Sequence, residues 1–409
     1  MKNRQGVGNA TTKVTSFDIT DGTIHWEITD QNGFPSQPGY GAGLVCFVTG
    51  GRLQVLDAVS GNLKYTVALI GGSNGQMPTI HEDSESGDVS AYVYAGSHMK
   101  AIDLGATEGQ IRWSQFASAN DFSIPTIVGD SVVVSGYAFD RATGAANRFD
   151  TRSIGTTVSY DENLRQLYVV AWVDNTLGYG VTAYSYKGND SITQLWQSTG
   201  AGISRASVAI GPGGHLYAVD STTIIELDPT TGNVLRSLGG QSLVGGVAPI
   251  ISEGFLWTSS KDEILVYDLL TFSHHRTLPT SRGGLNPTFD SPGAMDDSHF
   301  IIDYGTTFQQ PGFEVWVVSR SFIRGDASAD GVVNLDDAIL ILDRLFGGGS
   351  GFICAKAGDS NDDGKMNVLD AINVLLSAFR GKQLPEPFQS CGADPTKDAL
   401  SCESFPPCM

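Results

Sequence analysis

Short segments of alternating apolar and polar residues make up most of the chain from residue 1 to residue 320. They are rich in β-branched and aromatic side chains and are bounded by glycine, aspartate or serine, a pattern typical of β-strands joined by tight turns. Apolar residues do not recur there at helical spacing. The strongest candidates for inner strands are seven runs, at residues 43–48, 91–95, 131–135, 166–173, 215–219, 254–258 and 299–303.

A turn motif recurs between these runs. An aspartate precedes a glycine by a few residues, and in the full copies an aromatic residue follows the glycine by four positions. Aspartate accepts hydrogen bonds from the backbone of such a turn, and glycine tolerates the positive φ that a short hairpin needs. The spacing averages about 42 residues, within the range of β-propeller blades. Full copies start at Asp18, Asp57 and Asp103, copies without the aromatic at Asp140 and Asp228, and degenerate copies lie at residues 184–196 and at Asp268.

Four strands in each period predict a mainly β fold, a seven-bladed β-propeller. No inner strands precede the hairpin at residues 14–26, so we expect the strands at 299–303 to complete its blade. This would close the ring and protect the sheet edges. A further strand-like segment at residues 313–318 leaves an eight-bladed ring as the alternative. An array of immunoglobulin-like domains would need units of about 100 residues, which is too long for this period.

The spacing of aspartate, glycine and tryptophan at residues 18–26 and 103–113 resembles the repeat of pyrroloquinoline quinone (PQQ) dehydrogenases, the quinoprotein-like group. The resemblance covers roughly residues 10–320 and implies the propeller fold. Enzymes of this group hold the quinone with a disulfide between adjacent cysteines, a stacking tryptophan and an acidic calcium site. This chain has no adjacent cysteines, and Cys46 is the only cysteine in the propeller. We therefore expect the fold without PQQ.

Two segments after residue 320 have the spacing of calcium-binding EF-hand loops. In each twelve-residue segment, side-chain oxygens occupy positions 1, 3, 5, 9 and 12, and glycine occupies position 6. Calcium takes about six to eight oxygen ligands, one of them the carbonyl of position 7, so the spacing predicts two calcium ions. The predicted ligands are Asp326, Ser328, Asp330, Val332, Asn334 and Asp337 in the first loop, and Asp359, Asn361, Asp363, Lys365, Asn367 and Asp370 in the second.

Each loop leads into an amphipathic helix whose apolar residues recur at i, i+3, i+4 and i+7, which predicts a buried face. Residues 326–346 align with residues 359–379 without a gap, so the two halves form an internal duplication. Two acidic turns that cap helices are the alternative interpretation. The predicted buried residues are Leu335, Ala338, Ile339, Leu342 and Phe346 in the first helix, and Val368, Ala371, Ile372, Leu375 and Phe379 in the second.

No helix is expected ahead of the first loop, because residues 315–319 are strand-like. The pair of loop-helix halves resembles a type I dockerin over about residues 322–385. The resemblance implies a calcium-folded module of secreted multidomain bacterial proteins that docks onto a cohesin or cell-surface partner, often in polysaccharide degradation. Dockerins commonly carry small hydroxyl residues at loop positions 10 and 11. This chain has Leu335 and Asp336 there in the first loop, and Val368 and Leu369 in the second.

Four of the five cysteines, Cys354, Cys391, Cys402 and Cys408, lie close to the C-terminus. An even cluster in a short segment predicts disulfides and an oxidising compartment. We therefore expect an extracellular or cell-surface location, although residues 1–13 contain no signal-peptide core. Three pairings are possible, and we favour Cys354 with Cys391 and Cys402 with Cys408. A zinc site would be the alternative, but this tail has no histidine.

The chain carries 44 acidic and 25 basic residues, for a net charge of −19. Such a charge repels a phosphate backbone and argues against a nucleic-acid partner. No apolar run reaches the roughly 18 residues of a membrane-spanning helix. The metallohydrolase motif His-Glu-x-x-His is missing, and no Gly-x-Ser-x-Gly lies between a strand and a predicted helix as in a nucleophile elbow. The adjacent His274 and His275 would point to opposite faces of a strand, and residues 81–88 are interpreted as a charged loop.

These patterns predict a propeller at residues 1–320, a dockerin-like domain at 321–385 and a cysteine-containing tail at 386–409. We expect a non-catalytic scaffold whose propeller presents a surface to a protein, a ligand or a glycan. The dockerin-like domain would bind calcium and attach the protein to a cohesin-like or cell-surface partner. The alternative is a propeller enzyme that carries the same domain, either a polysaccharide-degrading hydrolase or lyase or a PQQ-dependent dehydrogenase. No catalytic residue is assigned.

Overall fold

The computed structural model describes residues 2–5, 12–17, 23–30, 36–69, 77–118, 124–150, 157–174, 178–189, 191–198, 207–220, 222–241, 243, 248–252, 254–260, 263–279, 294–295, 299–304, 312–317, 321–348, 352–396, 398, 400, 402 and 405–408. The chain forms two compact units. The first comprises Met1–Ile251, Leu256–Ala294 and Ile301–Val315, and the second comprises Ser252–Phe255, Met295–Phe300 and Trp316–Met409. Residues 2–317 are called the sheet region below, and residues 321–408 the C-terminal module.

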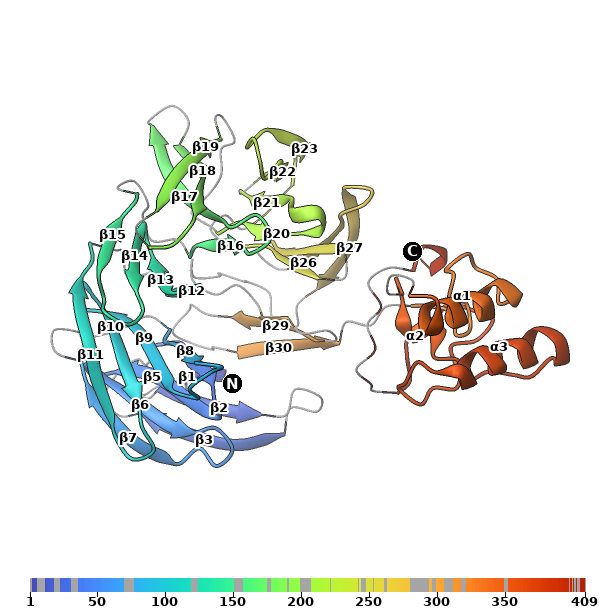
Figure 1. The fold of residues 1–409 in the computed structure, drawn as a ribbon, viewed down its shortest axis with the longest axis horizontal. Coiled ribbons are helices and arrows are strands. Elements are labelled where there is room, and N and C mark those ends of the chain that lie inside the picture. Colours follow the sequence, from blue (N-terminus) through green and yellow to red (C-terminus); the bar gives the residue numbers. More distant parts are fainter. Residues whose placement is uncertain are drawn as a thin grey trace. The chain divides into compact units, whose positions relative to one another are not determined.

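Eight antiparallel sheets lie in the described part of the sheet region, six with four strands and two with three. Figure 1 shows the sheets from β1 to β23 following one another around a common centre, as the blades of a β-propeller do. The first four sheets are β1 (Lys2–Gln5), β2 (Thr12–Phe17) and β3 (Ile24–Asp30); β4 (Gly39–Gly41), β5 (Leu44–Thr49), β6 (Arg52–Asp57) and β7 (Leu63–Ala68); β8 (Thr79–Glu82), β9 (Val89–Ala95), β10 (His98–Leu104) and β11 (Gly109–Phe116); and β12 (Thr126–Val128), β13 (Ser131–Val134), β14 (Tyr137–Asp140) and β15 (Ala146–Arg148).

The other four sheets continue the same up-and-down order, with a short 3-10 helix, η1 (Pro212–Gly214), ahead of β21. They are β16 (Ser159–Asp161), β17 (Gln166–Asp174), β18 (Gly178–Tyr186) and β19 (Ile192–Gln197); β20 (Ala209–Ile210), β21 (Leu216–Val219), β22 (Ile224–Leu227) and β23 (Val234–Leu238); β24 (Ile250–Ser252), β25 (Phe255–Ser259), β26 (Glu263–Asp268) and β27 (Ser273–Pro279); and β28 (Ala294–Met295), β29 (His299–Tyr304) and β30 (Gly312–Val317).

Both faces of a typical sheet are buried against its neighbours, as strand β5 illustrates. Leu44, Cys46 and Val48 pack with residues of β9 and β10 in the following sheet. Val45 and Phe47 pack with residues of β2 and β3 in the preceding sheet. Because successive side chains of a strand point to opposite faces, burial on both faces produces a continuous apolar run in the sequence.

The aromatic residue of the repeat motif packs on the turn of the next sheet. Nε1 of Trp113, in β11, donates a hydrogen bond of 2.9 Å to the carbonyl oxygen of Arg141. Its ring covers Gly144, where a Cβ would lie 2.7 Å from Trp113 Cδ2 and where φ is +75°. The same contact joins Trp26 to Ala58 and Gly61, Tyr65 to Gly105 and Gly109, and Trp196 to Pro229 and Gly232.

An arginine takes the place of this aromatic residue in β23. Nη2 and Nη1 of Arg236 donate hydrogen bonds of 2.8 and 3.0 Å to the carbonyl oxygens of Leu269 and Leu270. The guanidinium carbon lies 4.5 Å from the ring centroid of Phe272. Arg236 also forms an ion pair with Glu226, whose side chain is 2% exposed. The contact between neighbouring sheets is therefore kept with different chemistry.

The mainly β fold and all seven predicted inner strands are confirmed, by β5, β9, β13, β17, β21, β25 and β29. The predicted closure is wrong. Strands β2 and β3 pair with β1, and β29 pairs with β28 and β30, so the first hairpin and residues 299–303 lie in different sheets. The described residues thus form eight sheets, as in the predicted eight-bladed alternative. Strand β1 was missed because its sequence, Lys-Asn-Arg-Gln, has no apolar alternation. The turn predicted at Asp18 lies outside the described residues.

The C-terminal module contains helices α1 (Leu335–Phe346), α2 (Ala355–Gly358) and α3 (Val368–Arg380) and a short 3-10 helix, η2 (Pro406–Cys408). Both long helices begin with a capping box, in which an asparagine accepts from the backbone and the third residue of the helix accepts in return from the asparagine backbone. The pairs are Asn334 with Asp337 and Asn367 with Asp370. No helix is formed at residues 321–325, as predicted.

The predicted buried face of the helices is only partly correct. Ala338 and Ala371 are buried, but the contact between α1 and α3 is completed by Ile341 and Val374. The apolar face of each helix is wider than the contact between them, so one edge packs between the helices and another edge faces solvent. The predicted core residues that are exposed instead are Leu335, Ile339, Phe346, Val368, Ile372 and Phe379.

The predicted disulfide pairing is wrong. Cys354 is bonded to Cys402, and Cys391 to Cys408. Packing of the tail on the module brings these sulfurs together, because Phe405 and Phe322 are both buried with ring centroids 6.5 Å apart. Residues 386–409 therefore belong to the same compact unit as residues 321–385.

Candidate metal centre

The first predicted calcium loop wraps its backbone around two buried carboxylates. Asp326, at position 1, accepts hydrogen bonds from the amides of Asp330 and Gly331 at 3.1 and 2.8 Å. Asp337, at position 12, accepts from the amides of Ser328 and Asn334 at 2.9 and 2.8 Å. Both carboxylates are fully buried. The two ends of the loop are thus held around one small volume.

The second loop repeats these contacts. Asp359 accepts from the amides of Asp363 and Gly364 at 3.2 and 2.8 Å. Asp370 accepts from the amides of Ser360 and Asn367 at 3.1 and 2.8 Å. The backbone is also the same in the two loops, since the residue at position 4 has φ of +57° in the first loop and +61° in the second. The duplication seen in the sequence therefore extends to the geometry.

The remaining predicted ligands lie on the same loops. Ser328 donates to Asp326 at 3.2 Å, and Asn361 donates to Asp363 at 3.0 Å. The position-9 asparagines cap the helices with their amide oxygens and donate to the position-7 carbonyls, Asn334 to Val332 and Asn367 to Lys365. All twelve predicted residues are thus brought together as two sets of six.

Burial sets the electrostatics of the loops. Desolvation raises the pKa of Asp326, Asp337 and Asp359, and raises that of Asp370 to about 6, although amide hydrogen bonds oppose the shift. Within the described residues, no lysine, arginine or histidine forms an ion pair with these four carboxylates. A buried carboxylate without a positive partner is unfavourable. An all-oxygen donor set of this kind fits calcium.

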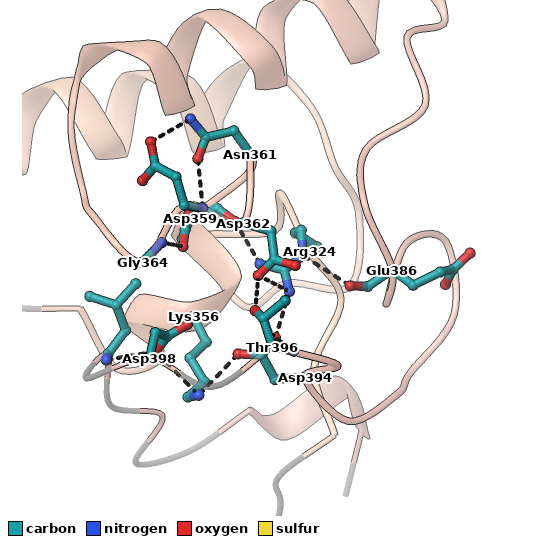
Figure 2. Close-up of polar contacts among 12 residues, drawn as sticks. Arg324, Lys356, Asp359, Asn361, Asp362, Gly364, Glu386, Asp394, Thr396 and Asp398 are labelled. Atoms are coloured by element: carbon teal, nitrogen blue, oxygen red, sulfur yellow. Dashed lines mark hydrogen bonds and ion pairs between the residues drawn. The ribbon is translucent and has the colours of Figure 1, made fainter.

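A buried arginine beside the second loop was not predicted from the sequence. Arg324 is fully buried and donates to the carbonyl oxygens of Asp359 and Glu386 at 2.8 and 3.1 Å. It also forms ion pairs of 3.0 and 2.8 Å with Asp362 and Asp394 (Figure 2). Nothing in the local sequence marks this residue, because its partners lie 35 to 70 positions away.

The tail places a further group of carboxylates at the second loop. Lys356 forms ion pairs with Asp394 at 2.9 Å and with Asp398 at 3.3 Å. Figure 2 shows Asp394 and Thr396 next to Arg324, and Asp398 next to Lys356. Asp359, Asp362 and Asp398 each offer one oxygen within 4.8 Å of the others.

The weaker signals in the sheet region have ordinary structural roles. His274 lies on an exposed strand and its Nε2 is 2.8 Å from Thr277 Oγ1. Asp83 accepts from the amides of Glu85 and Ser86 at 3.1 and 2.9 Å and so closes the predicted charged loop. In the part of the chain that the structure describes, no helix is long and apolar enough to cross a membrane.

Comparison with known proteins supports the propeller fold of the sheet region. The PQQ_2 family model, described as outer membrane protein assembly factor BamB, matches residues 2–177, which is less than half of the chain. No curated protein matches the sequence significantly. The C-terminal module is not covered by this family match.

Solved structures show the same fold at low identity. BamB from Moraxella catarrhalis has a TM-score of 0.56 and 14% identity, covering 76% of this chain and 90% of that chain. The computationally designed Ika8 protein has a TM-score of 0.56 and 15% identity, covering 78% of this chain and 94% of that chain. A europium-containing methanol dehydrogenase reaches a TM-score of 0.43 at 12% identity, over 68% of this chain and 79% of that chain. The sheet region therefore has the β-propeller fold of BamB and Ika8, and its residues 2–177 are similar to the PQQ_2 family model.

Proposed function

We propose that this protein is a non-catalytic propeller scaffold carrying a calcium-dependent attachment module. The observation that carries the proposal is the pair of equivalent loops, each with two fully buried aspartates whose charge no ion pair offsets in the described residues. One calcium ion in each loop would remove this imbalance. The predicted ligands would hold the ions, with carbonyl oxygens of Val332 and Lys365 completing the sets.

The calcium ions would also stabilise the module. Each loop is closed by the carboxylate that follows the helix cap, so the ion and the start of the helix share one residue, Asp337 in α1 and Asp370 in α3. A ligand that binds only the folded state stabilises that state. We therefore expect the module to lose stability when calcium is removed.

An exposed apolar surface on the two helices supports attachment to a protein partner. Three pairs of large apolar residues, each at equivalent positions of the two halves, face solvent. Their exposed fractions are 44% and 40% for Leu335 and Val368, 54% and 43% for Ile339 and Ile372, and 73% and 68% for Phe346 and Phe379. In each helix they recur at i, i+4 and i+11 and so lie along one side, and exposed apolar stripes of this kind are typical of interaction sites. A cohesin-like or cell-surface protein is the proposed partner.

The two disulfides support a location outside the cytoplasm, since such bonds persist in oxidising compartments. The propeller would then present a protein, ligand or glycan surface at that location, and a role in polysaccharide degradation follows from the dockerin resemblance. PQQ is not proposed, because the sequence lacks the adjacent cysteines of quinone sites.

Limited proteolysis of the full chain tests the calcium proposal. With excess calcium, cleavage within residues 321–409 should be slow, and EDTA should accelerate it while cleavage of the sheet region stays unchanged. Equal rates in both conditions would contradict the proposal. Mass spectrometry of the fragments identifies the region that opens.

Binding to immobilised cohesin domains tests attachment. The full chain should bind with calcium and be released by EDTA, and the double variant I339D/I372D should not bind. V59D is the matched control, because Val59 is an apolar residue of the sheet region that is 87% exposed. Equal binding by both variants would show that the apolar helix surface is not the attachment site.

A further inference from the structure

The tail covers the two loops with different chemistry. At loop position 4, the first loop has Ala329 where the second has Asp362. Next to the position-6 glycines, Pro407 lies 3.6 Å from the Cβ position of Gly331, and Asp398 lies 3.1 Å from that of Gly364. Carboxylates therefore surround the second loop where the first loop has apolar groups.

These carboxylates converge on one place. Asp359, Asp362 and Asp398 bring one oxygen each within 4.8 Å of the other two. Asp359 is fully buried, and the side chains of Asp362 and Asp398 are only 10% and 9% exposed. Three acidic groups this close and this buried repel one another, and the ion pairs of Asp362 with Arg324 and of Asp398 with Lys356 offset this repulsion only in part.

Asp398 has an oxygen that the protein does not satisfy. Its Oδ1 accepts from the amide of Leu400 at 2.8 Å and faces Lys356 Nζ at 3.3 Å. Its Oδ2 is buried and, within the described residues, has no hydrogen-bond partner. A buried oxygen without a hydrogen-bond partner lowers the stability of the folded state, and a bound ligand would remove this cost.

The charges around the cluster do not balance. Besides Asp359, which the loop ion would balance, three carboxylates face two cationic groups, which leaves one negative charge in excess; the groups are Asp362, Asp394 and Asp398 on one side, and Arg324 and Lys356 on the other. Asp394 is satisfied by both cations, at 2.8 and 2.9 Å. A divalent cation that shares Asp359 with the loop ion would offset this excess.

We propose that Asp359, Asp362 and Asp398 bind a further hard divalent cation of the calcium class, distinct from the two loop ions. Oxygen donors of this kind prefer such cations. Asp359 would be shared with the second loop, so the inference rests in part on the proposed function. The site would tie the disulfide-bonded tail to the second loop, whereas the first loop would have no equivalent.

Calcium stoichiometry of the full chain tests this site. The chain is stripped with chelator and dialysed against calcium alone, and bound calcium is measured by elemental mass spectrometry. We expect D398N to bind one ion fewer than the unmodified chain, and D362N to do the same. D343N removes one negative charge from an exposed position of α1 and should bind the full number. Far-UV circular dichroism of each variant verifies folding.

The outcomes separate this inference from the function proposed above. Loss of one ion in D398N, with the loop ions retained, supports the site. An unchanged number in both D398N and D362N overturns it and leaves the two loop ions in place. If D326N and D370N also leave the number unchanged, both the further site and the calcium-dependent module are wrong.

Discussion

Trp113 and Gly144 belong to neighbouring sheets, and the indole ring of Trp113 lies directly on the face of Gly144. A Cβ at Gly144 would be 2.7 Å from Trp113 Cδ2, and Trp113 Nε1 donates to the carbonyl of Arg141 in the same turn. The repeated aspartate-glycine turn is therefore both a hairpin and a docking surface for the preceding sheet. This relationship explains why glycine and the aromatic recur at one spacing.

Replacing Gly144 by alanine should destabilise the propeller. The new Cβ would clash with Trp113, and alanine would have to adopt φ of +75°. We expect a loss of about 2–4 kcal/mol in the free energy of unfolding, measured by urea denaturation. G43A is the control, because Gly43 has φ of +70° with nothing within 4 Å, and should lose only about 1 kcal/mol. Equal losses would show that the tryptophan contact contributes nothing.

The variant R236M, which removes only one partner of the ion pair, should lose more stability than the double variant E226Q/R236M, which removes both charges. Burial alone would raise the pKa of Glu226, but hydrogen bonds from Arg236, His215 and Tyr217 outweigh it and lower the pKa. R236M leaves a buried carboxylate with fewer partners, for an expected loss of about 3–5 kcal/mol. Urea denaturation measures this loss, and the double variant E226Q/R236M should recover part of it.

The same pair gives a pH dependence with a definite sign. Because the folded-state pKa of Glu226 is lowered, its contribution to stability is present above the ordinary value of 4.5 and is lost as the pH falls through the folded-state pKa. Thermal unfolding between pH 7 and pH 3 should show an acid-side loss in the unmodified chain that is smaller in E226Q. Identical acid-side profiles would contradict this assignment.

Calcium binding by the second loop should weaken below pH 6. Burial raises the pKa of Asp370 from 3.8 to about 6. In the ion-free module, the stability from this group is present below pH 3.8 and is lost as the pH rises through about 6. Calcium needs the ionised form, so protons compete with it and affinity at pH 5 should be about tenfold lower than at pH 7. Calorimetric titration measures this, and a constant affinity would contradict it.

Non-reducing digestion should reveal the disulfide pairing. Trypsin places Cys354 in peptide 345–356, Cys391 in peptide 383–397, and Cys402 with Cys408 in peptide 398–409. The pairing in the structure links all three peptides. Further cleavage after Glu403 should separate a pair containing Cys354 and Cys402 from one containing Cys391 and Cys408. A free peptide 398–409 with an internal bond would instead support the pairing favoured from the sequence.

The strands, turns and loops of this protein could be predicted from its sequence because they depend on local interactions. Each predicted strand, aspartate-glycine turn and twelve-residue loop depends on residues that are close together in the sequence. Side-chain alternation, positive φ and ligand spacing each involve only a few neighbouring positions. The seven inner strands and the arrangement of Asp326 with Asp337 followed from such patterns. The gapless match between the two halves even anticipated that the loops share one backbone.

Other features depend on groups far apart in the chain, and only the tertiary structure decided them. The sequence does not indicate that β1 gives the first sheet a third strand, and it left open whether the strand-like segment at residues 313–318, now β30, belongs to an eighth sheet. It also does not show that Cys354 meets Cys402 across a sequence separation of 48. The sequence cannot show which edge of the apolar face of α1 and α3 packs inward, since that face is wider than the contact between the helices. Nor does it show that Arg324 has partners in three separate segments. Which of these long-range contacts form depends on how the whole chain packs, and a local sequence pattern does not determine that packing.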